Sequence, residues 1–176
     1  KNKVAIQAVN EKLAKIKIPE KASELGTPKG ELEDGTVFYL AEQDNVETLL
    51  AAIRAEHPGK AILLDIWATW CAPCIYDMKE GKENKAKLKE MGVEVVYICS
   101  SEGSNPDTWK KKVTELKVNT QHFFLSDALS KEIMQYFNLR GFPSHIFLDV
   151  NGQMVPNVIN GLREVDFDRV KENIGQ

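Results

Sequence analysis

Blocks of apolar residues recur along this chain between polar stretches, and their spacing predicts strands that alternate with helices. Continuous apolar runs rich in branched side chains occupy residues 61–67 and 93–99, a pattern typical of strands that are covered on both faces. Between them, residues 74–91 are rich in lysine and glutamate, which predicts a solvated helix with Gly81 as a weak point. These three segments form the centre of the predicted fold.

Shorter signals complete the predicted order of elements. Apolar runs at 36–40 and 122–125 predict further strands, and residues 144–155 predict a hairpin with an Asn-Gly turn. Helical spacing of apolar residues predicts helices that begin near residues 44, 105, 129 and 167. We therefore expect an α/β fold in which a mixed central sheet carries helices on both faces.

The first 35 residues differ from the remainder. Apolar residues recur at helical spacing up to Ile16, and residues 19–35 are polar and rich in turn formers, which predicts a short helix and a linker. We divide the chain into this N-terminal part, residues 1–35, and a main domain, residues 36–176. The helix is either the tail of an upstream domain or an arm packed on the main domain.

Composition and charge narrow the functional classes. The 176 residues are 43% hydrophobic and 28% charged, as in ordinary globular proteins, and the net charge of −3 provides no basic field for nucleic acid. No apolar run reaches the roughly 18 residues of a membrane span, so we expect no membrane contact by this chain. It begins at Lys1 without a signal segment, so we expect a processed product or an excised piece whose targeting segment, and any membrane anchor, lies outside it.

The candidate chemistry lies in the segment WATWCAPC, where Cys71 and Cys74 stand with two residues between them. A structural zinc site needs about four ligands, and the remaining candidates, Cys99 and three histidines, show no second paired spacing. A disulfide across so short a loop removes little chain entropy, which argues against a stapling role. We therefore expect no metal and no cofactor, and we interpret the pair as a redox centre.

The position of the pair supports this interpretation. It lies where a buried strand ends and a helix begins, so backbone N–H groups and the positive helix end stabilise the Cys71 thiolate and lower its pKa from about 8.5 toward neutrality. Pro73 falls in the first helical turn, where its missing N–H costs nothing. We expect Cys71 to be exposed and Cys74 to be sheltered.

Two motifs resemble those of a known family. WATWCAPC resembles the W-x-x-W-C-x-P-C active site of thioredoxin-like proteins, and IYDM after it resembles the C-x-x-E-M continuation of the TlpA/ResA type. NLRGFPSHIFLDVNGQM resembles that family's second landmark, G-x-P-x-x-x-x-x-D-x-x-G, and the likeness covers residues 36–174. It implies an extracytoplasmic thiol–disulfide oxidoreductase with a thioredoxin-like fold, extended at 36–56 and with an insertion at 100–125 after the central strand–helix–strand unit.

The resemblance also implies roles for individual residues. Cys71 becomes the nucleophile that attacks a disulfide of a partner protein, and Cys74 becomes the thiol that resolves the mixed disulfide. Pro143 becomes a cis proline beside the disulfide, and the Phe142 backbone pairs with an extended substrate. The implied partners are protein thiols and disulfides and an upstream redox protein. The residues implied to contact substrate are Trp70, Ala72, Pro73, Phe142 and Pro143.

Two aspartates are candidates for proton handling. Asp65 interrupts the apolar run ILLDIW; it is either a buried carboxylate that exchanges a proton with Cys74, as in thioredoxin, or a wet side chain near a strand end. Asp77 stands where the TlpA/ResA type carries glutamate, and it is either a shorter catalytic carboxylate or an ordinary one near a helix start. Lys79 replaces a proline that often follows in that family, so we expect a helix without the usual kink.

Two other functions stay open at this point. Peroxiredoxins share the fold, but Thr69 and Cys71 do not reproduce their P-x-x-x-T-x-x-C spacing. A non-catalytic thioredoxin-like binding module would use the surface around Trp70 and Pro143. The motif is shared by reductants and oxidants, so it leaves the direction of exchange open. The residues interpreted as packing residues are Cys99, His122 and His145.

Overall fold

One mixed sheet organises the protein, with strands in the spatial order β1-β2-β5-β4-β3-β6. The structure is a computed structural model that describes residues 2–19 and 25–175. The four inner strands run parallel to one another, whereas β1 and β6 run antiparallel to their neighbours. The expected mixed α/β sheet is thereby confirmed. In chain order the elements are α1 (Asn2–Leu13), β1 (Thr27–Glu31), β2 (Val37–Leu40), α2 (Val46–Glu56), β3 (Ala61–Trp67), α3 (Ala72–Glu80), α4 (Lys82–Glu90), β4 (Val93–Cys99), α5 (Pro106–Leu116), β5 (His122–Phe124), α6 (Asp127–Tyr136), β6 (Ser144–Leu148) and α7 (Phe167–Asn173).

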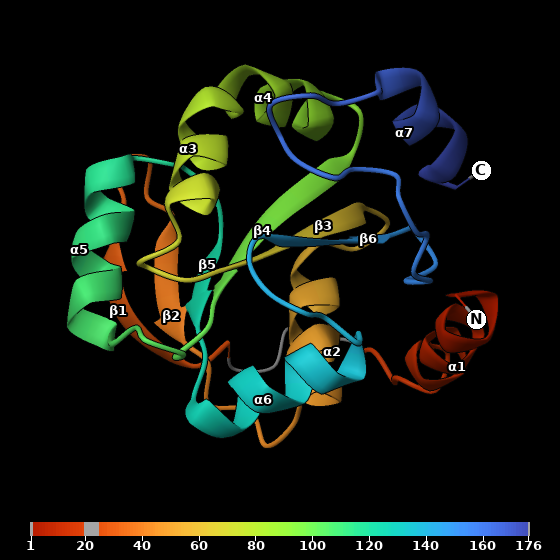
Figure 1. Ribbon diagram of the computed structural model, residues 1–176, viewed down its shortest axis with the longest axis horizontal. Coiled ribbons are helices and arrows are strands. Elements are labelled where there is room, and N and C mark those ends of the chain that lie inside the picture. Colours follow the sequence, from red (N-terminus) through yellow and green to blue (C-terminus); the bar gives the residue numbers. More distant parts are fainter. Residues whose placement is uncertain (1, 20–24, 176) are drawn as a thin grey trace.

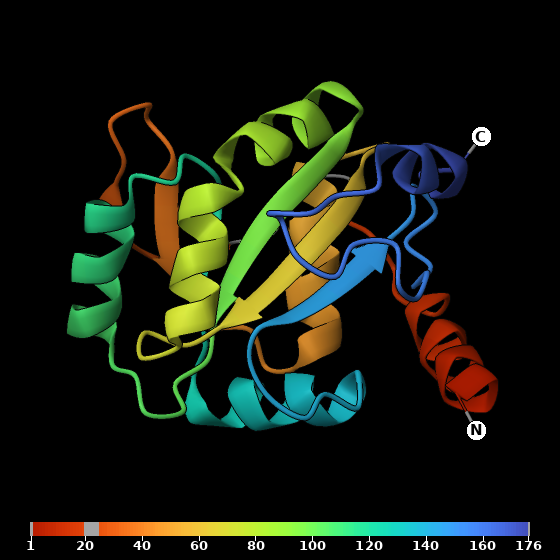
Figure 2. The same cartoon turned by 45° about the horizontal axis from the view of Figure 1, so that its top comes forward.

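Helices cover both faces of the sheet, which divides the core into two apolar clusters. Helices α3, α4, α5 and α7 lie over one face of the sheet, and α2 and α6 lie over the other (Figures 1 and 2); their buried side chains form the two clusters. All seven residues of β3 are buried. Leu63 and Trp67 face the α3 side, whereas Ile62, Leu64 and Ile66 face the α2 side, because successive side chains of a strand point to opposite faces.

The helix expected over residues 74–91 is divided at Gly81 into α3 and α4. The expectation of an unkinked helix is therefore wrong. The Gly81 N–H still donates to the Asp77 carbonyl at 2.8 Å, but a Cβ at Gly81 would collide with the Cβ of Leu162. Glycine at this position lets the segment around Leu162 approach the helix closely.

The hairpin expected after β6 is only partly formed. Gly152 adopts φ +77° in the turn, and the side chain of Asp149 accepts hydrogen bonds from two backbone N–H groups of that turn. Beyond the turn, the pairing is limited to one bridge between Leu148 and Met154. The hydrogen bonds to β6 and the residue after it are made by Gln153 and Val155, so the N–H and C=O of Met154 point away from β6, and the Asn10 side chain binds both of them, at 2.8 and 3.2 Å.

The N-terminal helix α1 packs on the main domain. Val9 and Leu13 are buried in the cluster on the α2 side, and Asn10 binds Met154. The structure therefore shows α1 packed on the main domain, and the tail of an upstream domain stays a prediction. In the stretch expected to be a linker, residues 20–24 lie outside the described residues and residues 27–31 form β1, which corrects that expectation.

The polar sequence of β1 explains why it was missed. It is an edge strand that pairs with β2 alone, and most of its side chains are exposed. The apolar alternation that marks a half-buried strand is therefore lacking. The division of the chain at residue 36 stays a prediction.

We expect Leu13→Ala to lower the free energy of unfolding by about 2–5 kcal/mol, because a fully buried leucine is replaced by a cavity. Val4→Ala, at a side chain on the same helix that is 74% exposed, should change it by less than about 0.5 kcal/mol. Chemical denaturation of both variants measures the difference. Equal, small effects would show that α1 does not contribute to the stability of the domain.

Candidate active site

Cys71 and Cys74 form a disulfide at the start of α3, with their Cα atoms 5.3 Å apart. Cys71 is the N-cap residue of the helix, and its Sγ accepts a hydrogen bond from the Cys74 N–H at 3.3 Å. Both residues are buried, with Cys71 only 2% exposed. The expectation of an exposed Cys71 is therefore wrong for the disulfide form, because the disulfide lies within the apolar cluster on the α3 face.

The helix start has the features expected of a thiolate site. Pro73 lies in its first turn, where a residue without an N–H leaves no hydrogen bond unmade. The hydrogen bond from the Cys74 N–H points at the sulfur of Cys71. In the reduced protein the same N–H and the positive end of the helix stabilise negative charge on that sulfur.

The loop after β4 holds the tryptophan that precedes the disulfide. Trp70 is 57% exposed, and its Nε1–H donates to the Glu102 carbonyl at 2.7 Å. Gly103, with φ +64°, lies against the indole ring so closely that a Cβ there would collide with it. The indole also packs against the ring of Phe142, with centroids 5.9 Å apart and ring planes at 72°. Trp70 is thus an ordered, exposed ring beside the disulfide.

Phe142 and Pro143 approach the site from the segment before β6. The peptide bond between them is cis, which is the geometry that the family resemblance implies. Ser144 follows directly and pairs with Ile66, near the end of β3. Phe142 is half-buried against the cluster that contains both cysteines.

A group of buried charges lies on the same face of the sheet as the disulfide. Asp65, 1% exposed, stands opposite His145 in the ladder between β3 and β6. His145 Nε2 lies 3.5 Å from an oxygen of Asp65 and 3.5 Å from an oxygen of Asp77, which comes from α3. These separations are longer than hydrogen bonds, so the attraction is mainly between charges.

The surroundings shift the pKa values of all three groups. Burial raises the pKa of Asp65, and the nearby His145 offsets only part of this effect. Burial also opposes ionisation of Asp77, but His145 and the backbone N–H groups of Leu162 and Arg163 outweigh it and lower its pKa. For His145, burial disfavours the charged ring, but the two carboxylates outweigh it and raise the pKa to about 9.

Asp77 is turned toward the chain segment that follows the hairpin. Its carboxylate accepts hydrogen bonds from the N–H of Leu162 at 2.8 Å and of Arg163 at 3.2 Å. The Arg163 side chain lies 3.4 Å away. The carboxylate therefore joins α3 to this segment and to His145.

The sequence predicts only a packing role for His145, whereas the structure places its ring between Asp65 and Asp77. The signal in the sequence is a second polar residue in an apolar strand, two positions after Pro143. The neighbouring residues do not show, however, that this histidine lies opposite Asp65 in the sheet. His122 does pack in the core: it is fully buried, and burial lowers its pKa to about 4. Cys99 is also fully buried, and burial raises the pKa of its thiol.

The donor atoms of Asp65, Asp77 and His145 lie within 4.8 Å of one another, close enough for three ligands of one cation. The ring nitrogen lies 3.5 Å from an oxygen of each carboxylate and makes an ion pair with both. We therefore assign the group as a buried ion-pair cluster.

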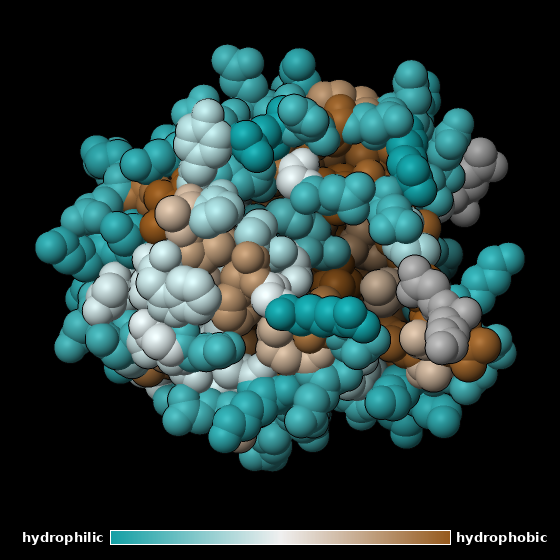
Figure 3. All heavy atoms as spheres, in the orientation of Figure 1, coloured by the Kyte–Doolittle hydropathy of each residue, from teal (hydrophilic) through white to brown (hydrophobic). Residues whose placement is uncertain are grey.

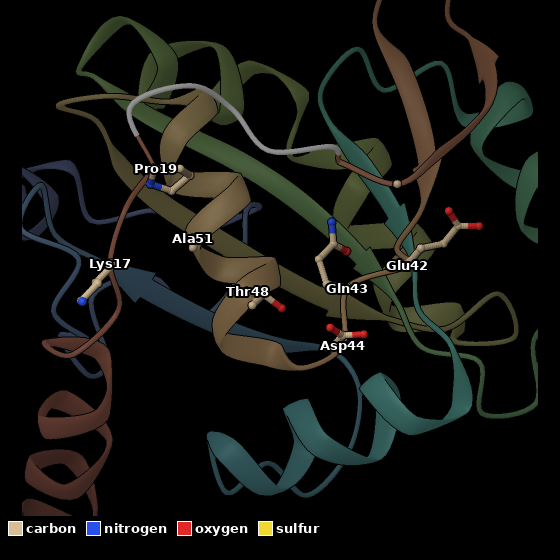
Figure 4. A pocket seen from close by; sticks show the side chains of 8 residues that line it. Lys17, Pro19, Glu42, Gln43, Asp44, Thr48 and Ala51 are labelled. Atoms are coloured by element: carbon tan, nitrogen blue, oxygen red, sulfur yellow. The ribbon is translucent and has the colours of Figure 1, made fainter.

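A hollow of about 520 Å³ lies elsewhere on the molecule, beside α2 (Figure 4). Neither cysteine lines it, and none of the three residues of the ion-pair cluster does. We therefore do not connect it with the disulfide chemistry. Its lining residues are Lys17, Pro19, Gly26, Glu42, Gln43, Asp44, Thr48 and Ala51.

Comparison with known proteins gives a consistent result. A family model described as Redoxin matches residues 30–170. The thiol–disulfide oxidoreductase ResA of Geobacillus kaustophilus is 25% identical over 120 residues, which cover 68% of this chain and 66% of the relative. ResA of Bacillus anthracis is 29% identical over 103 residues, which cover 57% of this chain and 56% of the relative. The chain thus spans about half to two thirds of the length of these curated relatives.

Solved structures share the fold. A thiol:disulfide interchange protein of the thioredoxin family from Chlorobium tepidum superposes with a TM-score of 0.56 at 18% identity, covering 84% of this chain and 92% of the other. The thioredoxin domain of a thiol–disulfide oxidoreductase from Bacteroides vulgatus gives a TM-score of 0.55 at 18% identity, covering 86% and 93%. The expected thioredoxin-like fold is confirmed.

The raised pKa of His145 predicts how stability depends on pH. The ring titrates near pH 6.5 when unfolded and at about 9 when folded, so its stabilising contribution is complete below 6.5 and is lost as the pH rises through 9. Between pH 6.5 and 8 the free energy of unfolding of the oxidised protein should fall by about 1 kcal/mol. Denaturant titrations at these two pH values measure the change.

Two other groups with shifted pKa values contribute mainly outside this pH window. His122, with a folded pKa of about 4, contributes mainly below it, and Lys85, with a folded pKa of about 8, contributes above it. His145→Gln should remove the part of this change that comes from the ring, and His145→Gln combined with Asp65→Asn should also remove the part that comes from the facing carboxyl, whose raised pKa lowers stability in the same direction. A wild-type stability that stays constant or rises there would contradict the assignment of a charged His145.

Proposed function

This chain belongs to the redoxin family, and we propose that it is a thiol–disulfide oxidoreductase that exchanges a Cys71–Cys74 dithiol and disulfide with cysteines of other proteins. The observation that carries the proposal is the disulfide at a helix start, where the Cys74 N–H is directed at the sulfur of Cys71. This arrangement favours a thiolate on the first cysteine and keeps the second within reach of it.

The proposed exchange has two steps. The Cys71 thiolate attacks a substrate disulfide, so that a mixed disulfide forms and one substrate sulfur leaves as a thiolate. Cys74 then loses its proton and attacks the sulfur of Cys71, which releases the second substrate sulfur and closes the Cys71–Cys74 disulfide. Two electrons pass from the protein to the substrate, and the reverse sequence oxidises a substrate dithiol.

Asp65 is the proposed acceptor for the Cys74 proton. It lies on the α3 side of β3, because its side chain alternates with those of Ile66 and Leu64 on the other side. Its burial raises its pKa, which brings the carboxyl closer to the operating pH, as suits a group that takes up and returns a proton.

The surface around the disulfide suits a polypeptide substrate. Trp70, Ala72 and Pro73 are exposed, and Phe142 and Pro143 are partly exposed. Apolar and weakly polar side chains gather on this face, over the segments that lead from β3 into α3 and from α6 into β6 (Figure 3). An extended chain that pairs with the Phe142 backbone would lie across the disulfide, whereas a small thiol has no backbone to pair.

The proposal includes an upstream redox partner and a location outside the cytoplasm, which the likeness to the TlpA/ResA type supports. In residues 2–19 and 25–175, no helix combines the length and apolar character needed to cross a bilayer. No observation specifically favours peroxide reduction or a purely binding role.

Trapping of mixed disulfides tests the roles of the two cysteines. Cys74→Ser should accumulate disulfide-linked partners through Cys71, because the resolving thiol is absent. Cys71→Ser should accumulate none, because the remaining cysteine is not the attacking one. Non-reducing electrophoresis after incubation with a protein that contains a disulfide measures both, with Cys99→Ala as a matched control that should behave as wild type.

The reversed trapping pattern would overturn the assignment of the two cysteines. Failure of the wild-type protein to reduce or oxidise any protein disulfide would overturn the proposed function itself.

Replacement of Asp65 tests its proposed role. Asp65→Asn should slow exchange most near neutral pH, because Cys74 loses its proton acceptor. It should also raise the free energy of unfolding there, since a carboxyl whose folded pKa is raised loses stability as the pH rises above its unfolded value. The pH–rate profile and denaturant unfolding measure these effects, with the exposed Asp44→Asn as a control. Unchanged rate and stability at every pH would refute the role.

A further inference from the structure

We propose that His145 is a positioning residue for this exchange: its imidazolium bridges the carboxylates of Asp65 and Asp77, so that Asp65 can ionise and accept the proton of Cys74 near neutral pH. The inference rests on the proposed function and deepens it. It assigns a role to a side chain that the two sequence motifs do not mark as functional.

The geometry places one positive group between two negative ones. A single nitrogen, Nε2 of His145, lies 3.5 Å from an oxygen of each carboxylate. The side chains of His145, Asp65 and Asp77 are 5%, 2% and 7% exposed, so water screens these charges little. One imidazolium leaves the cluster with a net charge of −1, whereas a neutral ring would leave it with −2.

Without the cation, the two carboxylates would oppose each other's ionisation. Their facing oxygens lie within 4.8 Å, and two carboxylates that share a buried site cannot both ionise readily. Asp77 is additionally favoured as the anion by the N–H groups of Leu162 and Arg163. Asp65 would therefore be the member of the pair that stays protonated, and a protonated carboxyl cannot take the proton of Cys74.

Other groups facing the cluster do not replace His145. Tyr97 comes from β4 and stands opposite Asp65 in the ladder; burial, with the two carboxylates, raises its pKa, so it is a neutral phenol. Arg163 lies on Asp77 at 3.4 Å, but its side chain is 52% exposed. From α3, the cysteines add further negative charge when reduced. In the described part of the chain, the positive group beside Asp65 is His145.

Asp77 supplies the anchor for the bridge. Its carboxylate is fixed by backbone N–H groups at 2.8 and 3.2 Å, and it fixes the imidazole in turn. Each of the three residues then has one role. Asp65 accepts the proton, His145 provides the compensating positive charge, and Asp77 holds His145 in place. This assignment also gives a role to Asp77, for which the sequence leaves a catalytic and an ordinary role open.

Titration of the histidine ring in the wild-type protein tests the charge directly. Nitrogen chemical shifts of the oxidised, ¹⁵N-labelled protein should show the His145 ring still protonated at pH 8, with the signal assigned by its loss in His145→Gln. An ordinary midpoint near pH 6.5, or a lower one, would overturn the proposal. This measurement does not depend on exchange activity.

The pH profile of exchange tests the consequence. In His145→Gln the acid limb of the pH profile of kcat/KM should move to higher pH by about one unit or more. At a given pH on that limb, kcat/KM should fall about tenfold, whereas at high pH it should approach the wild-type value. His57→Gln, a matched substitution remote from the cluster, should leave the profile unchanged. A drop of equal size at every pH would indicate a merely structural role and would overturn the proposal.

A double variant separates charge from packing. Adding Asp77→Asn to His145→Gln removes the opposing carboxylate, so the acid limb should return toward its wild-type position. No return would overturn the electrostatic argument. If His145→Gln does not fold, the titration of the His145 ring in the wild-type protein still decides.

The outcomes for the two proposals can be told apart. An absence of exchange in the wild-type protein would overturn the proposed function. Normal exchange with an unshifted acid limb in His145→Gln would overturn only the proposed role of His145.

Discussion

A carboxylate in the middle of a fully buried strand needs compensation, and much of the structure around the disulfide provides it. Asp65 lies in a strand whose seven residues are all buried. Its compensation comes from His145, which is directly opposite in the antiparallel ladder. His145 is held by Asp77, which is itself held by the N–H groups of the segment at Leu162. That segment reaches α3 because Gly81 leaves room for it. One buried charge thus connects β3, β6, α3 and the C-terminal segment.

The disulfide is held by some of the same elements, through apolar packing and helix capping. Its sulfur atoms lie in the apolar cluster on the α3 face, and Cys71 caps the helix that also carries Asp77. Asp77 is six positions beyond Cys71, so a change at the helix start can reach the buried charges through about two helical turns. Since electrostatic interactions strengthen where water is excluded, the burial of both groups on one face makes the charge of the cluster relevant to the thiols.

The sequence was sufficient for the features that depend on local pattern. The apolar runs of β3 and β4 and the cysteine pair at the strand–helix junction follow from neighbouring residues. The partners of Asp65 and Asp77 could not be predicted, because they depend on contacts between distant segments: Asp77 and Leu162 are 85 positions apart. The burial of Cys71 depends likewise on how several elements close over the disulfide. Strand β1 escaped prediction because an edge strand exposed on both sides carries no apolar alternation.

The two hydrogen bonds between the Asn10 side chain and the Met154 backbone affect which sheet edges are open to other chains. The outer strand β6 lies at one margin of the sheet, and an unpaired margin is a template for intermolecular β-aggregation. In the segment next to β6, the side-chain amide of Asn10 occupies the N–H and the C=O of Met154. At the opposite margin, Pro28 lacks an N–H and lies at an irregularity in the pairing of β1. Both margins are thus blunted against edge-to-edge pairing with a second chain, at one side by a side-chain amide and at the other by a proline.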